Sequence, residues 1–107
     1  MSRYLFRFGF CTPVQFASNS AHGWDDEASS SFFIEAESSD QALEWGEEVA
    51  DRFVQALFAA EGGEVFDWRA SDFARWIDDS PEEEYSARQL ANKQVVKVGE
   101  FPDFTKL

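Results

Sequence analysis

A strand pattern that runs directly into a long amphipathic helix, over Phe32–Gly62, constrains the fold of this chain more than any other feature. Ser38 at the N-cap, with Gln41 three residues later, is typical of a capping box that begins a helix. The pair Gly62-Gly63 can end it in the left-handed conformation. Between these signals, small and apolar residues recur at helical spacing on one face: Ala42, Gly46, Val49, Ala50, Phe53, Ala56, Leu57 and Ala60. The pattern predicts a core-packing helix over Ser39–Glu61.

One residue of that apolar face is unfavourable for a helix. Gly46 costs about 1 kcal/mol of helix propensity relative to alanine. We therefore expect the helix backbone to lie close to a strand or to an aromatic ring at this residue. The opposite face is acidic, and Glu48 is spaced for an ion pair with Arg52 one turn later.

Alternating apolar residues predict strands before and after this helix. In Arg3–Phe10, one face would carry the aromatic side chains Tyr4, Phe6, Phe8 and Phe10. The other predicted strands are Ser31–Glu37, Glu64–Arg69 and Gln94–Val98. We expect an antiparallel arrangement, with the aromatic faces toward the core.

Two short helices are predicted in the C-terminal part of the chain. Ser71 could cap the first, in which Phe73, Trp76 and Ile77 would share a face. Ser80-Pro81 starts the second, because proline favours the first helical position, and this helix would run to Ala91 with a Glu84–Arg88 ion pair. The 107 residues thus predict a single α+β domain, 1–107: an antiparallel sheet of about four strands with one long helix on one face and one or two short C-terminal helices.

The chain is strongly acidic, with 21 Asp+Glu against 9 Lys+Arg and a net charge of −12. This balance argues against binding nucleic acid or an anionic membrane, because both require clustered basic side chains. The single cysteine, Cys11, excludes an intramolecular disulfide, and no apolar run or leader pattern is evident. We expect a cytoplasmic protein. The sequence leaves open whether chains associate as a homo-oligomer through an uncovered sheet edge.

The densest group of charges lies at the start of the predicted Ser80–Ala91 helix. Its members are Asp78, Asp79, Glu82, Glu83 and Glu84, with Trp76 and Tyr85 as flanking aromatic residues. Carboxylates in a first helical turn are favoured by the helix dipole, so this run can be an ordinary solvated helix start. It also has the character of an acidic and aromatic surface that binds a basic protein.

The segment Cys11–Ser30 is predicted to be a hairpin loop, whose first part could extend the preceding strand. Phe16, His22 and Trp24 make it a candidate site, because aromatic residues in loops often bind partners or small molecules. A Cys11–His22 pair is conceivable as a nucleophile and base, but structural cysteines are more common than reactive ones. With one His and one Cys, the chain has no zinc-site pattern, and we expect neither metal nor cofactor.

Two functions follow from these residues. The favoured hypothesis is a non-enzymatic interaction domain, such as an inhibitor or an immunity-like protein, that presents its acidic run to a basic partner. No motif in the chain is specific to such a family. The alternative is a small-molecule-binding or hydrolytic domain with an aromatic pocket under the Cys11–Ser30 loop.

Overall fold

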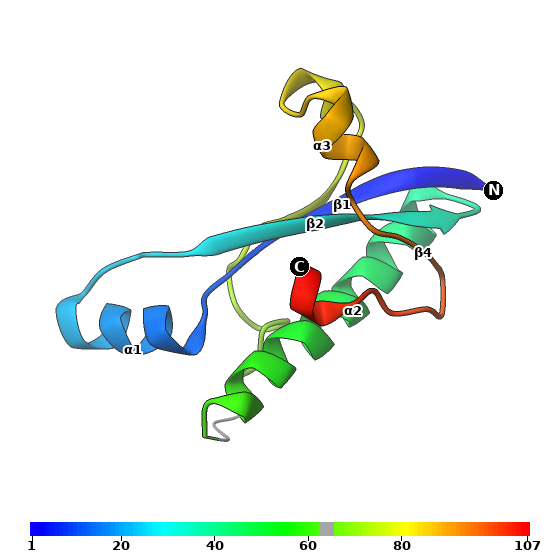
Figure 1. The fold of residues 1–107 in the computed structure, drawn as a ribbon. Helices are drawn as coiled ribbons and strands as arrows, with labels where there is room; N and C mark the ends of the chain where they lie inside the picture. The colour runs from blue at the N-terminus through cyan, green and yellow to red at the C-terminus, as the bar shows by residue number, and fades with distance from the viewer. Residues whose placement is uncertain (63–65) are drawn as a thin grey trace.

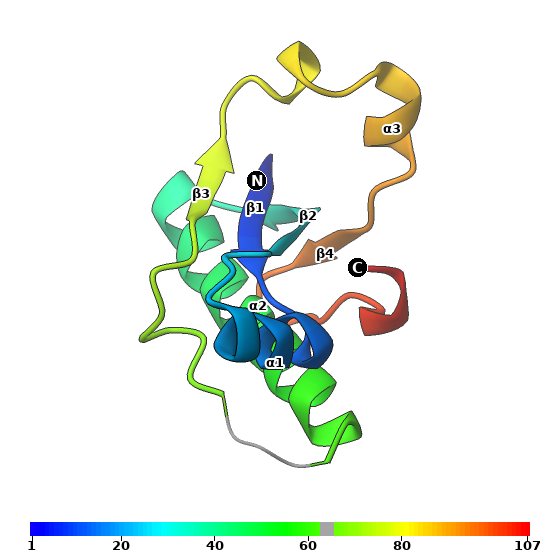
Figure 2. The same cartoon turned by 90° about the vertical axis from the view of Figure 1, so that its left-hand side faces the viewer.

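The computed structural model describes residues 1–62 and 66–107, and within them the strands form one mixed sheet in the order β3-β1-β2-β4. The strands are β1 (Ser2–Phe10), β2 (Ala28–Ala36), β3 (Arg75–Asp78) and β4 (Val95–Lys97). β1 is antiparallel to both β2 and β3, whereas β2 and β4 are parallel. The α+β architecture is as predicted, but the all-antiparallel sheet is wrong. The chain leaves β3 at one edge, crosses the sheet and enters β4 at the other edge, so β4 runs in the same direction as β2 (Figures 1 and 2).

The core lies between the sheet and the long helix α2 (Ser39–Ala60), which packs on one face of the sheet (Figure 1). The alternation predicted for β1 is confirmed: Phe6, Phe8 and Phe10 are buried on the α2 side. Phe6 lies opposite Phe32 of β2, and the two rings meet edge to face with centroids 5.7 Å apart. Aromatic side chains from neighbouring strands thus form the centre of the core.

Helix α2 begins and ends almost where the sequence predicts. Ser38 Oγ accepts a hydrogen bond from the Gln41 backbone N–H (3.1 Å), but the Gln41 side chain accepts from the N–H of Glu37 rather than of Ser38 (2.9 Å). The last helical residue is Ala60, and Gly62 has the positive φ of 123° that favours glycine. Gly63 lies outside the described residues. The predicted Glu48–Arg52 ion pair is present at 3.0 Å.

At Gly46 the backbone of α2 lies close against Phe6 of β1. The ring of Phe6 occupies the space in which a Cβ on Gly46 would stand, so the expected contact with an aromatic ring is confirmed. In the second half of α2, the set of buried residues differs from the predicted one. Val54 and Phe58 are buried there, whereas Ala56 and Ala60 are exposed.

The predicted hairpin loop over Cys11–Ser30 is wrong, because it contains the helix α1 (Pro13–His22). Thr12 caps this helix: its Oγ1 accepts from the N–H of Gln15 (3.2 Å), and the Gln15 side chain accepts from the N–H of Thr12 (2.9 Å). Pro13 occupies the start of the helix, and Gly23 ends it with a φ of 69°. These are strong helix signals, and they override the alternation of Val14, Phe16 and Ser18 that suggested a strand.

The predictions for the segment after α2 are also wrong. Of the strand expected over Glu64–Arg69, the described residues 66–69 form turns and irregular backbone, and the remainder lies outside the described residues. The helix expected after Ser71 is absent from the described structure, because residues 75–78 form β3 and pair with β1. The segment before β3 is held by hydrogen bonds that the Arg75 side chain donates to its backbone carbonyls.

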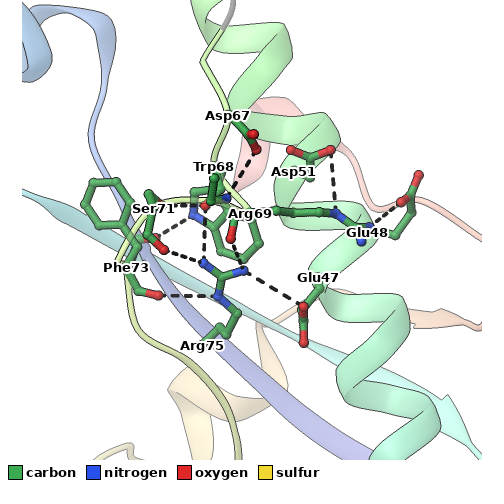
Figure 3. A network of polar contacts seen from close by, with 11 residues as sticks. Glu47, Glu48, Asp51, Asp67, Trp68, Arg69, Ser71, Phe73 and Arg75 are labelled. Carbon is green, nitrogen blue, oxygen red and sulfur yellow. Dashed lines mark hydrogen bonds and ion pairs between the residues drawn. The ribbon is translucent and has the colours of Figure 1, made fainter.

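Figure 3 shows how Arg75 organises this segment. Its guanidinium donates to the backbone carbonyls of Trp68 and Ser71, each at 3.2 Å, and lies 3.8 Å from the centroid of the Trp68 ring. Glu47 of α2 lies 3.9 Å from the same guanidinium. These bonds satisfy the backbone carbonyls of Trp68 and Ser71 without a helix, which helps to explain why a non-helical conformation is stable here.

The single helix predicted from Ser80 to Ala91 is divided in two. A short 3-10 helix, η1 (Pro81–Glu83), is followed by the helix α3 (Ala87–Ala91), for which Ser86 is the N-cap. Ser86 Oγ accepts a hydrogen bond from the N–H of Gln89 at 3.1 Å. This capping box of Ser86 and Gln89 begins a new helix after η1. The strand β4 confirms the predicted Gln94–Val98 strand. After it, the chain forms the 3-10 helix η2 (Phe104–Lys106). Within the described ranges, the helices are too short or too polar to cross a membrane.

Candidate functional site

The segment that connects β3 to β4, which contains η1 and α3, arches over the face of the sheet opposite α2 (Figures 1 and 2). Arg7 of β1 points to this face and is flanked across the sheet by Trp76 on β3 and Ser31 on β2. This arrangement brings the acidic run of β3 and η1 next to a basic side chain from the first strand.

The Arg7 guanidinium is held by two acids and two aromatic rings. Its Nη1 donates to Asp78 Oδ2 at 3.0 Å and lies 2.8 Å from Glu84 Oε2. Its Cζ lies over the ring of Trp76, 4.9 Å from the centroid, and over the ring of Tyr85, 5.1 Å from the centroid. We call these residues, Arg7, Trp76, Asp78, Glu84 and Tyr85, the Arg7 cluster.

The Arg7 cluster is partly removed from water. The exposed fractions of the Arg7 and Asp78 side chains are 18% and 13%. Burial by itself would lower the pKa of Arg7, but its hydrogen bonds to Asp78 and Glu84 outweigh this effect and raise the pKa. The positive charge of Arg7 is therefore permanent. Its bond to Asp78 is strengthened by low exposure, whereas the Glu84 side chain is 63% exposed and its bond is weakened by water.

The sequence-predicted acidic site is divided by the structure into two kinds of residue. Trp76, Asp78, Glu84 and Tyr85 contact Arg7, and Asp79, Glu82 and Glu83 are exposed beside them. The predicted Glu84–Arg88 pair is replaced by the pair between Glu84 and Arg7. Sequence reasoning missed Arg7 because it is far from these residues in the chain. The one available signal was its position on the non-aromatic face of β1, which indicated that its side chain lies on the face of the sheet away from the aromatic core.

The three residues of the second predicted site do not form one group. His22 stacks on Trp24 with ring centroids 4.3 Å apart, at the exposed end of α1. Phe16 packs instead against Phe58 (5.7 Å) and Phe66 (5.4 Å). The hollow beside Phe16 is lined by Pro13, Phe16, Ala17, Phe58, Glu61 and Gly62, so neither His22 nor Trp24 contributes to it.

Among residues 1–62 and 66–107, no cluster of three or more His, Cys, Asp or Glu side chains could hold a metal ion. Cys11 is a free thiol with an exposed fraction of 3%. Burial raises its pKa, which keeps the thiol in its neutral, weakly nucleophilic form at neutral pH.

Comparison with known proteins identifies no relative: no protein-family model, curated protein or solved structure matches this chain.

Proposed function

We propose that this protein is a non-enzymatic interaction domain that presents the acidic edge formed by β3 and η1 to a basic protein. The observation that carries the proposal is the group of three exposed acids, Asp79, Glu82 and Glu83, beside the Arg7 cluster. The two carboxylates and two aromatic rings of that cluster are occupied by the Arg7 guanidinium, so a basic partner would be met by these acids and by the exposed part of Trp76.

The acids next to the Arg7 cluster would supply the attraction. Asp79, Glu82 and Glu83 are exposed, and no ion pair to them is found within residues 1–62 and 66–107. Their negative charge is therefore available to steer a basic partner toward this edge.

Trp76 would supply the buried contact. Its exposed fraction is 40%, so a large apolar surface is free for a partner to cover. The contact with Arg7 restricts the Trp76 ring, and a restricted side chain loses less conformational entropy on binding. Aromatic side chains of this kind commonly provide most of the affinity of an interface, while exposed charges at its rim add little.

Two variants with the same change in net charge test the proposal. The first, Asp79→Asn/Glu82→Gln/Glu83→Gln, neutralises the edge and keeps Glu84, which pairs with Arg7. The second, Glu37→Gln/Glu61→Gln/Asp72→Asn, neutralises three exposed acids elsewhere. Association with a fluorescent octa-arginine peptide, and with any protein captured from the native host, is measured across a range of salt concentrations.

We expect the edge variant to associate about tenfold more slowly at low salt and to lose most of the salt dependence. The control variant should remain within about twofold of the wild type, because attraction by net charge alone is weak and screened. Equal effects of the two variants would refute the proposal, as they would assign the attraction to total charge rather than to this edge.

A further inference from the structure

A polar hollow of about 510 Å³ lies on the β4 side of the same sheet face, away from the acidic edge. It is bounded by β2, by α3 and the turn after it, and by the C-terminal η2. In Figure 2, β2 is near the centre, α3 at the upper right and η2 at the lower right. The lining of the hollow includes Ser29, Ser31, Tyr85, Asn92, Lys93 and Lys106. Its volume is in the range of about 300–1,000 Å³ that small-molecule sites occupy.

The positive charge in this hollow is unusual for the chain. Only three of the 107 residues are lysines, Lys93, Lys97 and Lys106, and two of them line the hollow. Every ion pair in the part of the chain that the structure describes uses an arginine, so neither of these lysines has a carboxylate within ion-pair distance there. In a protein with 21 acidic residues, Lys93 and Lys106 thus form no ion pair within that part of the chain, although the pKa of the nearby Asp103 is lowered by hydrogen bonds from Thr105 and, to a smaller extent, by the charge of Lys106.

Lys93 is also held in place. Its Nζ donates to Ser31 Oγ at 2.6 Å and lies 4.2 Å from the centroid of the Tyr85 ring. An ammonium group has three N–H donors, so others remain after the bond to Ser31. The hydroxyl of Ser29 and the amide of Asn92 add neutral donors to the same lining.

We propose that this hollow binds a small molecule bearing a phosphate monoester. Such a group carries a charge of about −1.5 to −2 at neutral pH and three strongly accepting oxygens. Two ammonium groups match that charge, and the hydroxyl and amide donors match the additional oxygens. The inference goes beyond the proposed function, because it uses a ligand of opposite charge and shares only Tyr85 with the Arg7 cluster, and none of the exposed acids lines the hollow. Its success or failure is therefore separable from that of the interaction with a basic partner.

The probes are inorganic phosphate and phenyl phosphate, titrated at constant ionic strength against sodium chloride. Backbone amide shifts of the 107-residue chain are followed by two-dimensional NMR. We expect saturable shifts at residues 29–31 and 92–94 with both probes below about 20 mM.

Single lysine variants then locate the binding. Lys93→Gln and Lys106→Gln should each weaken binding by about tenfold, because each removes a charge-assisted hydrogen bond. Lys97→Gln is the matched control, since Lys97 is exposed on β4 and is not part of the lining. It should change the affinity by less than about twofold. If Lys93→Gln disturbs the fold through Tyr85, the comparison of Lys106→Gln with Lys97→Gln decides.

Three results would overturn the proposal: no saturation with either probe, shifts centred elsewhere on the protein, or equal weakening by Lys97→Gln and Lys106→Gln. The last would mean that the phosphate responds to general positive charge near the C-terminus and not to this hollow.

Discussion

The close approach of α2 to β1 makes Gly46→Ala a sharp test of the packing. A Cβ at residue 46 would lie 2.5 Å from Cγ and 2.7 Å from Cε1 of Phe6, and closer still to Cδ1. Carbon atoms in contact normally stay about 3.5–4.0 Å apart, so the new methyl group would overlap the ring by about 1 Å. Phe6 cannot retreat, because it is fully buried and packs against Phe8 at 5.6 Å and against Phe32 at 5.7 Å.

Two opposing terms set the magnitude. Alanine improves helix propensity by about 1 kcal/mol over glycine, whereas overpacking a core costs about 1–3 kcal/mol and occasionally more. Since the obstacle is an immobile aromatic ring, the cost should exceed the upper end of that range. We expect the free energy of unfolding to fall by about 2 kcal/mol or more, which lowers the Tm by about 8–16 °C for a domain of this size. Urea and thermal unfolding followed by circular dichroism measure both quantities.

A double-mutant cycle assigns the cost to the Phe6 ring. In a Phe6→Leu background the aromatic ring is gone, so Gly46→Ala should be close to neutral or should stabilise by up to about 1 kcal/mol. A Gly46→Ala protein that is more stable than the wild type would refute the close approach. An equal cost with and without the Phe6 ring would show that the obstacle is another part of the sheet.

Three further predictions test the Arg7 cluster, the core around Trp68 and the buried thiol of Cys11. Arg7→Gln should lower the free energy of unfolding by about 1–3 kcal/mol, because Asp78 would keep a mostly buried carboxylate without its partner; unchanged urea unfolding would contradict the role of the Arg7 cluster. Trp68→Phe should cost about 1–3 kcal/mol in the same assay, since the carbonyl of Gly9 loses a buried donor at 2.9 Å. Cys11 should react with a thiol reagent at least about a hundredfold more slowly in the native protein than in guanidinium, because it is buried and its pKa is raised. Since the folded pKa of Cys11 exceeds the unfolded one, its contribution to stability is present below the unfolded pKa and is lost as the pH rises through the folded pKa. Comparable native and denatured reaction rates would show that Cys11 is accessible.

Local sequence was sufficient to predict the elements whose signals are all short-range. The capping residues Ser38 and Gln41 and the 3.6-residue periodicity define α2, and the alternation of aromatic residues defines β1. Even the contact at Gly46 could be inferred, because a glycine in a helix interior is unfavourable without a tertiary reason. The helix α1 was predictable in the same way from Thr12, Pro13 and Gln15, but a competing alternation obscured it.

The tertiary structure alone decided where the edges of the sheet lie and what the acidic run contacts. The strand β3 has no strong pattern of its own and exists because Arg75–Asp78 pairs with β1 and Arg75 satisfies the carbonyls before it. The parallel direction of β4 follows from a crossing connection that no local signal encodes. Arg7 and Glu84 are distant in the chain but 2.8 Å apart in space. Periodicity and capping act within a few residues, whereas strand order and ion pairs depend on which distant segments meet when the core closes.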